Sequence, residues 1–339
     1  MAPAVLVENL KKSYGSVEAV KDVSFAIDPG EIFGLLGPNG AGKTTAIRCL
    51  CTLMKPDAGK LEINGISVLE NPQMARQMLG YIAQEVAPDK VLTGRELLQL
   101  QAAIYHLPKA KIKARIEQML ALLEITDIAD KKMGTYSGGQ MRRLDLAAGL
   151  LHQPAVLLLD EPTVGLDIES RTAVWQFLRQ LQKEGTSILL TSHYLEEVDM
   201  LANRVAIIDA GKVISSGTPA ALKAEVGGDR ITLRIREFTA DQEADEARSL
   251  LAKLPVVQEV IVNSAQGNSL NLVVDKGGEA LAAVQSALKE ADLPTFGIAQ
   301  SQPSLDDVYL AATGRTLMDA EMAAVGKRDV KKEKKQSMR

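Results

Sequence analysis

The stretch that decides the fold is Gly37-Pro38-Asn39-Gly40-Ala41-Gly42-Lys43-Thr44. It fits the pattern G-x-x-x-x-G-K-[S/T], follows an apolar run over Ile32 to Leu36, and precedes a helical pattern that begins at Thr44. Glycines let backbone N–H groups close around phosphate oxygens, and the start of a helix adds a favourable dipole. Lys43 would reach the β- and γ-phosphates, and Thr44 would ligate Mg²⁺. The motif predicts a phosphate loop, which by itself leaves kinases, GTPases and many ATPases open.

The composition is that of a folded protein large enough for two domains. The chain has 339 residues, of which 46% are hydrophobic and 24% are charged, and a domain usually holds about 150 residues. No stretch reaches the ~18 to 20 uncharged apolar residues of a membrane-spanning helix, and the first residues lack the apolar core of a secretory signal. We therefore expect a chain that neither spans a membrane nor is exported.

The overall charge and the cysteines exclude two kinds of site. The net charge of −4 gives no sign of a nucleic-acid partner, and none is expected. Cys49 and Cys51 fall on an expected helix with diverging side chains, and too few other ligands lie nearby for zinc. We expect them to be buried thiols.

Residues 1–226 read as one α/β unit with a helical insert. Short apolar runs alternate with helical patterns and predict buried strands of a largely parallel sheet. The runs are Ile32 to Leu36, Val156 to Leu159 and Ile188 to Leu190, after two expected antiparallel strands at Val5 to Leu10 and Val20 to Ile27. Helical patterns dominate from about 87 to 150, including Gly94 to Tyr105 and Lys111 to Ile125.

The rest of the chain, after a linker at Val226 to Asp229, shows a separate pattern of expected strands and helices. Residues 229–313 show strands and helices in the order β-α-β-β-α-β, with a last strand at Thr295 to Ala299 and a short helix at Ser304 to Ala312. This order predicts a small α+β domain of the split βαβ, or ferredoxin-like, type. Residues 314–339 are polar with almost no apolar periodicity, and we expect a disordered, solvated tail.

Two carboxylates end the apolar run Val156 to Leu159. A strand beside the phosphate loop would bring them to the metal and the γ-phosphate. Asp160 would hold Mg²⁺, mostly through water, and Glu161 is the candidate general base for the attacking water. A strand-terminal Asp-Glu pair is common on its own, so the assignment depends on the neighbouring motifs.

The stretch Tyr136-Ser137-Gly138-Gly139-Gln140 resembles the signature of the ATP-binding cassette (ABC) ATPases, usually written L-S-G-G-Q. The other motifs of that family stand in their expected order: the phosphate loop 37–45, Gln84 in 81–85, the carboxylates 160 and 161, Asp167 in 165–167, and His193 in 191–193. The resemblance covers about residues 4–222. It implies the P-loop NTPase fold of the ABC ATPases, with a mainly parallel core sheet, an antiparallel β subdomain and a helical subdomain, and it implies ATP and Mg²⁺ as cofactors.

The resemblance implies a role for each residue around the nucleotide. Tyr14 would stack on adenine, although a lone aromatic is more often a core residue. The phosphate-binding residues would be Gly37, Pro38, Asn39, Gly40, Ala41, Gly42, Lys43, Thr44 and Thr45. Gln84 would reach the Mg²⁺ or the water, together with the metal ligands Thr44 and Asp160. His193 would bind the γ-phosphate and position Glu161 and the water.

Two further motifs would act across a dimer. Ser137 begins a helix, and we expect its hydroxyl and the amides that follow to form an anion site. In the family this signature, here Ser137, Gly138, Gly139 and Gln140, meets the γ-phosphate held by the other subunit. Asp167 would couple the two sites, and a role as helix cap competes because a strong helical pattern follows it.

Local features resemble the daunorubicin-resistance or multidrug type of ABC exporter. They are Tyr136 in place of Leu, Arg142 and Arg143 after the signature, and the stretches 92–96 and 304–309. This implies a motor subunit for export of drug-like or hydrophobic compounds, paired with a second copy of itself or a homologous cassette. A separate polytopic permease would contact the helical insert and the Gln84 segment, which places the chain at the cytoplasmic face of the cell membrane.

An alternative is a non-transport ABC ATPase that acts on nucleic acid or ribosomes. The single phosphate loop, the short helical insert and the acidic balance disfavour it. An inactive ATP-binding scaffold fits poorly with a full set of catalytic residues. The C-terminal domain is expected to be a dimer-stabilising or regulatory module, and a purely structural appendage is nearly as good an interpretation.

Overall fold

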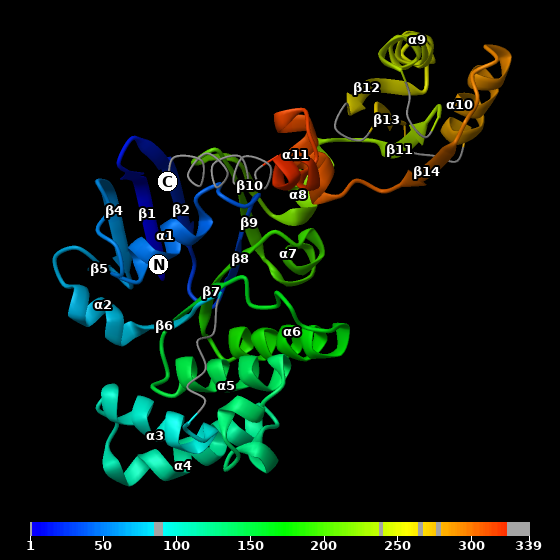
Figure 1. Cartoon of the computed structure of the whole chain (residues 1–339). Helices are drawn as coiled ribbons and strands as arrows, with labels where there is room; N and C mark the ends of the chain where they lie inside the picture. The colour runs from blue at the N-terminus through cyan, green and yellow to red at the C-terminus, as the bar shows by residue number, and fades with distance from the viewer. Residues whose placement is uncertain (1, 85–90, 237–239, 264–266, 276–278, 324–339) are drawn as a thin grey trace, which may run out of the picture. The chain divides into compact units, whose positions relative to one another are not determined.

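The computed structural model describes residues 2–84, 91–236, 240–263, 267–275 and 279–323 (Figure 1). The chain divides into two compact units, Met1–Ser216 and Gly217–Arg339. Each unit has its own sheet, one of ten strands and one of four.

Five parallel strands form the centre of the first unit. In the order of the sheet they are β9 (Arg204–Asp209), β3 (Ile32–Leu36), β8 (Ser187–Ser192), β7 (Val156–Asp160) and β6 (Leu79–Ile82). Every residue of β3, β7 and β8 is buried, as expected for parallel strands covered on both faces. The three apolar runs of the sequence are therefore confirmed as core strands.

An antiparallel ladder continues the same sheet. It contains β1 (Val5–Tyr14), β2 (Val17–Ile27), β4 (Ala58–Ile63) and β5 (Ile66–Ser67), and β10 (Lys212–Gly217) lies between β2 and β9. The two expected antiparallel strands are confirmed, and both are longer than the sequence indicated. They close through a tight turn at Gly15, whose positive φ of 59° suits glycine.

Helices cover the sheet and fill the insert. The core helices are α1 (Lys43–Leu50), α2 (Pro72–Met78), α6 (Ile168–Lys183) and α7 (Leu195–Leu201). The insert contains α3 (Gly94–Ile104), α4 (Lys109–Leu122), the 3₁₀ turns η1 (Thr126–Ile128) and η2 (Met133–Thr135), and α5 (Gly138–Leu150). Cys49 and Cys51 are buried free thiols, as predicted.

Helix α5 lies very close to strand β6. A Cβ on Gly80 would stand 2.3 Å from the carbonyl oxygen of Gly149, and a Cβ on Gly149 would stand 3.0 Å from the side chain of Ile82. Both glycines are therefore needed for this contact. The contact joins the helical insert to the strand that precedes Gln84.

The second unit has the expected β-α-β-β-α-β order. Its elements are β11 (Asp229–Arg234), α9 (Asp241–Leu251), β12 (Val257–Asn263), β13 (Ser269–Val274), α10 (Glu279–Glu290) and β14 (Gly297–Ser301). The sheet order β12-β13-β11-β14 is antiparallel at every pairing, which is the ferredoxin-like arrangement. The last strand begins two residues later than predicted, because Gly297 pairs with Arg234 of β11.

The boundary between the units differs from the expected one. Helix α8 (Pro219–Glu225) belongs to the second unit and packs on α11 (Leu305–Thr313). The division therefore falls after Ser216 rather than at residue 226. The reason is that α8 buries its apolar residues Pro219 and Leu222 and packs on α11, which belongs to the same unit.

The expectation of a disordered tail from residue 314 is wrong for its first ten residues. Residues 317–323 are helical, and Leu317 and Ala320 are 3% and 4% exposed. Asp319 Oδ2 accepts hydrogen bonds from Asn263 Nδ2 at 2.8 Å and from the amide and hydroxyl of Thr316 at 3.0 and 2.5 Å. A few buried contacts thus order a polar segment. Residues 324–339 lie outside the described residues.

Within the described ranges, none of the helices combines the length and the apolar character that a bilayer crossing requires.

The contacts of Asp319 give a stability prediction. Asp319→Ala removes the acceptor of three buried hydrogen bonds, so the free energy of unfolding should fall by roughly 1 to 3 kcal/mol. Urea denaturation of the full chain measures this change, and Glu290→Ala, an exposed position on α10, is the control. Equal stability of both variants would contradict the packing of residues 316–320.

Candidate active site

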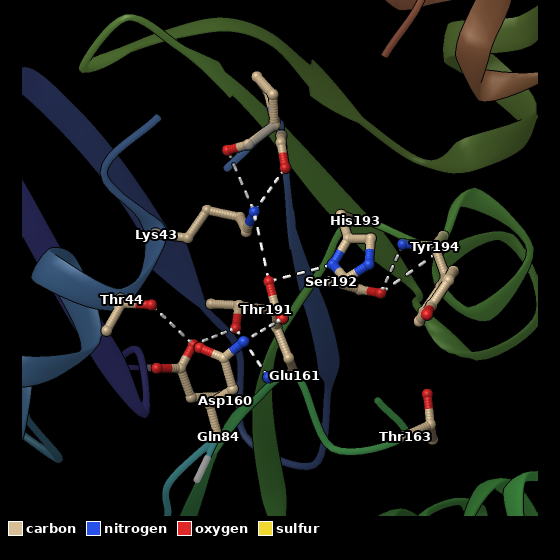
Figure 2. Close-up of polar contacts among 12 residues, drawn as sticks. Lys43, Thr44, Gln84, Asp160, Glu161, Thr163, Thr191, Ser192, His193 and Tyr194 are labelled. Carbon is tan, nitrogen blue, oxygen red and sulfur yellow. Dashed lines mark hydrogen bonds and ion pairs between the residues drawn. The ribbon is translucent and has the colours of Figure 1, made fainter. Parts of the chain in front are cut away.

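The motifs converge where the parallel strands end. Successive strands β6, β7, β8 and β3 present their carboxyl ends at one edge of the sheet, the usual place for ligands in such sheets. There β3 leads into the phosphate loop, β7 ends at Asp160, β8 ends at Ser192, and Gln84 follows β6. Figure 2 shows the side chains of these segments facing one another.

The phosphate loop is held tightly against neighbouring backbone. Gly37 has a φ of 158°, and a Cβ there would stand 2.2 Å from the carbonyl oxygen of Ile208. Gly42 has a φ of 114°, and its Cβ would stand 2.8 Å from the carbonyl oxygen of Ala19. Larger residues are excluded at both positions, so the loop conformation depends on these glycines.

Lys43 is the first residue of α1 and is 4% exposed. Its Nζ donates to the carbonyl oxygens of Gly37 at 2.5 Å and Pro38 at 3.3 Å, and it lies 3.7 Å from Glu161 Oε1. The ammonium is thus aimed across the loop toward the end of β7, where a bound phosphate would meet it.

Asp160 and Thr44 form the candidate magnesium site. Thr44 Oγ1 donates to Asp160 Oδ1 at 3.1 Å, and Thr191 Oγ1 donates to the same oxygen at 2.6 Å. Asp160 is 1% exposed, and its Oδ2 is buried without a hydrogen-bond partner among the described residues. Mg²⁺ prefers such hard oxygen ligands and shares them with nucleotide phosphates. The residues therefore fit the expected ion, and Thr191 is a supporting residue that the sequence did not single out.

Glu161 is the centre of the cluster. Its Oε2 accepts from Gln84 Nε2 at 2.7 Å, and its Oε1 lies 3.1 Å from Nδ1 of His193. The side chain is 4% exposed. Burial opposes its ionisation, yet the hydrogen bond with His193 and the charge of Lys43 outweigh it, and the pKa of Glu161 lies below its ordinary value. The three predicted catalytic residues therefore meet around one ionised carboxylate.

Tyr14 ends β1 beside the start of α1. Its hydroxyl lies 3.4 Å from Thr45 Oγ1 and donates to the sulfur of Met54 at 3.1 Å. The residue is 45% exposed, so it is not a core aromatic. It stands beside Thr45 at the end of the phosphate loop, and its stacking on adenine stays a prediction.

The signature caps helix α5. Ser137 Oγ accepts from the amide of Gln140 at 3.3 Å, and Gln140 Oε1 accepts from the amide of Ser137 at 2.9 Å, which is a capping box. The oxygen of the Ser137 hydroxyl therefore accepts a hydrogen bond within its own helix, and the predicted anion site at this helix start stays a prediction. Gly138 and Gly139 open the helix, and a Cβ on Gly139 would stand 2.7 Å from Ser170 Oγ.

Asp167 caps helix α6. Its carboxylate accepts from the amide of Ser170 at 2.8 Å and from the hydroxyl of Ser170 at 3.1 Å. The backbone hydrogen bond from Ser170 lowers the pKa of Asp167. The role as helix cap is therefore confirmed. The same Ser170 lies next to Gly139, so the signature and the Asp167 loop adjoin within one chain.

Arg142 is a functional candidate that the sequence did not reveal. Its position in the sequence, two residues after the signature, indicates only the subfamily. The residue is 5% exposed, and its guanidinium donates to backbone carbonyls on both sides of Glu161. The helical period alone did not show that this arginine points inward.

Comparisons with known proteins agree with this geometry. Residues 20–164 match the family model described as ABC transporter. The daunorubicin resistance ATP-binding protein DrrA3 of Streptomyces coeruleorubidus is 41% identical, over 92% of this chain and 96% of that protein. The Nod factor export ATP-binding protein I of Ralstonia nicotianae is 35% identical, over 94% of this chain and 96% of that protein.

Solved structures show the same fold. A dimeric ATP-binding cassette in a post-hydrolysis state, bound to ADP and Pi, is 25% identical with a TM-score of 0.59, and the match covers 63% of this chain and 98% of that one. The resemblance drawn from the motifs is thereby confirmed. The chain belongs to the ATP-binding proteins of ABC transporters, the ATPases that drive transport.

Proposed function

We propose that this chain is the ATP-hydrolysing motor subunit of an exporter for drug-like or hydrophobic compounds. The observation that carries the catalytic part is the buried carboxylate of Glu161, which faces Lys43, Gln84 and His193 at the end of β7. The proposed drug-like or hydrophobic cargo is supported by relatives whose names state drug resistance or Nod factor export.

The chemistry follows from the placement of these side chains. Glu161 accepts a proton from water while the water oxygen bonds to the γ-phosphorus and the bond from that phosphorus to the ADP oxygen breaks. Lys43 and His193 compensate the negative charge of the transferring phosphoryl group. Thr44 and Asp160, with Gln84 beside them, would hold Mg²⁺, which would neutralise phosphate charge. The pKa of Glu161 lies below its ordinary value, so the carboxylate is ionised at neutral pH and has the free lone pair that accepts the proton.

A second copy of this chain, or a homologous cassette, completes each ATP site in this proposal. Ser137, Gly138, Gly139 and Gln140 stand at the start of α5, where the helix dipole favours an anion. Asp167 adjoins this helix start through Ser170. The support for a dimer is this anion-binding helix start together with the dimeric cassette among the similar structures.

A separate polytopic permease is the proposed partner at the helical insert. A groove of about 720 Å³ runs between α2, α3, α5 and β6, and it reaches Ala83, next to Gln84. Leu53 and Ile104 line it and are 63% and 57% exposed. A short apolar helix of the permease fits such a groove. Binding there would place the chain at the cytoplasmic face of the cell membrane.

Action on nucleic acid or ribosomes is not favoured. The net charge of −4 provides no general attraction for a polyanion. Relatives named for drug resistance or for Nod factor export also align over more than nine-tenths of the chain.

Replacement of the proposed base tests the chemistry. Glu161→Gln keeps the shape of the side chain but cannot take a proton, so turnover should fall by roughly 10²- to 10⁴-fold while ATP binding persists. Phosphate release at saturating MgATP measures turnover, and light scattering should detect an ATP-dependent dimer. Glu196→Gln, at an exposed carboxylate of α7, is the control. Near-normal turnover in Glu161→Gln would remove Glu161 from its role.

The position of His193 predicts a change in pH dependence. Its hydrogen bond helps to lower the pKa of Glu161, so the wild-type carboxylate stays charged until the pH falls below the ordinary range of glutamate. His193→Ala removes that contribution and should raise the pKa of Glu161. The acid limb of the kcat profile should therefore move to higher pH, besides any loss of rate. An acid limb at the wild-type pH would show that His193 does not tune Glu161.

If the permease binds in this groove, substitutions there should prevent assembly with the permease and leave ATP binding intact. Leu53→Glu combined with Ile104→Glu places charge at two exposed apolar residues of the groove and should abolish co-purification with a polytopic membrane protein from detergent extracts of the host. ATP binding by the isolated chain should persist. Met200→Glu, at another exposed apolar side chain that is 51% exposed, is the matched control. Retention of the membrane protein by the double variant would refute docking at this groove.

A further inference from the structure

Arg142 is a charged side chain buried between the helical insert and the catalytic strand. It lies in the second turn of α5, and its side chain is 6% exposed. A buried guanidinium needs hydrogen-bond acceptors and a compensating charge. Asp145 provides the charge, with Oδ2 at 3.9 Å from Nη1. The acceptors are all backbone carbonyls of catalytic segments.

The guanidinium contacts both sides of Glu161. Its Nε donates to the carbonyl oxygen of Pro162 at 2.7 Å, and its Nη2 lies 3.4 and 3.3 Å from the carbonyl oxygens of Asp160 and Glu161. Its Nη1 donates to the carbonyl oxygen of Ala83 at 2.7 Å. One rigid group thus holds the segment that carries the base and the segment that carries Gln84.

The backbone at Glu161 needs such support. Its φ is +49°, a left-handed conformation that is strained for a residue with a Cβ. Its amide donates to the carbonyl and hydroxyl oxygens of Thr191, both at 3.1 Å. Thr191 therefore fixes the peptide before Glu161, and the guanidinium fixes the carbonyls around it. This conformation turns the carboxylate toward Lys43 and His193.

We propose that Arg142 is a positioning residue for ATP hydrolysis, which holds the backbone of residues 160–162 and of Ala83 so that Glu161 and Gln84 face each other and the attacking water. The proposal rests on the proposed function of Glu161 as the base. A lysine cannot replace the planar fork of donors, so the geometry of the group, and not its charge, is what the site uses.

Arg115 of helix α4 provides a control, because it binds the other end of α5. Arg115 donates through Nε to the carbonyl oxygen of Leu151 at 3.1 Å and through Nη2 to that of Leu150 at 2.7 Å. It binds backbone carbonyls with the same chemistry, and these carbonyls belong to the end of α5 rather than to the catalytic strand. A general effect on folding should therefore be shared by Arg115 and Arg142, whereas an effect on catalysis should not.

The test compares Arg142→Lys with Arg115→Lys in the full chain. Arg142→Lys should lower kcat by about 10- to 100-fold and leave KM for ATP within about twofold, because a misplaced base affects the chemical step more than binding. Arg115→Lys should change both constants by less than about twofold. Thermal melting reports any shared loss of stability. Equal kcat in the two variants would overturn the proposal.

A double-mutant cycle shows whether Arg142 acts through Glu161. In a Glu161→Gln background the base is absent, so adding Arg142→Lys should lower the residual rate by no more than about twofold. A multiplicative loss would mean that Arg142 does not act through Glu161 and would overturn the proposal. If Arg142→Lys does not fold, Arg142→Gln takes its place with the same outcomes. Near-normal turnover in Glu161→Gln alone would instead refute the proposed base.

Discussion

A buried negative charge at the end of β7 is the constraint on which the site depends. Glu161 is almost fully covered, and an ionised carboxylate in such a place needs nearby positive charge or hydrogen-bond donors. Lys43, Gln84 and His193 provide these from three other segments. The parallel sheet brings the segments together, because the strands before them are neighbours and end at the same edge. Each motif therefore serves the same carboxylate, and its lowered pKa keeps it ionised at neutral pH.

The helical insert is joined to this site by close packing. Gly80 and Gly149 allow α5 to lie against β6, and that approach brings Arg142 within reach of the backbone around Glu161. The groove proposed for the permease is lined by the same helix and strand, including Asp145, the charge partner of Arg142. Burial raises the pKa of Asp145 to about 6, against the influence of Arg142. The ion pair between Asp145 and Arg142 therefore connects the groove to the backbone of the catalytic strand.

The second unit is stabilised by an apolar core of its own and by a buried cluster of polar side chains. Its four antiparallel strands and helices α9 and α10 enclose a separate apolar core. The polar segment after residue 314 is ordered by Asp319, Thr316 and Asn263, whose mutual hydrogen bonds compensate for burying polar groups. The regulatory or dimer-stabilising role expected for this unit stays a prediction.

The sequence by itself determined the fold class and the order of the main elements, and it predicted the candidate site residues that the structure brings together. Apolar runs, helical periods and glycine positions are local signals, and the phosphate loop and signature are contiguous motifs, so they can be read without contacts. It did not predict the ordering of residues 316–320, the partners Thr191 and Arg142, or the left-handed backbone at Glu161. These depend on contacts between residues far apart in the chain. Only the tertiary structure decided them, because strand order and side-chain direction determine which distant groups meet.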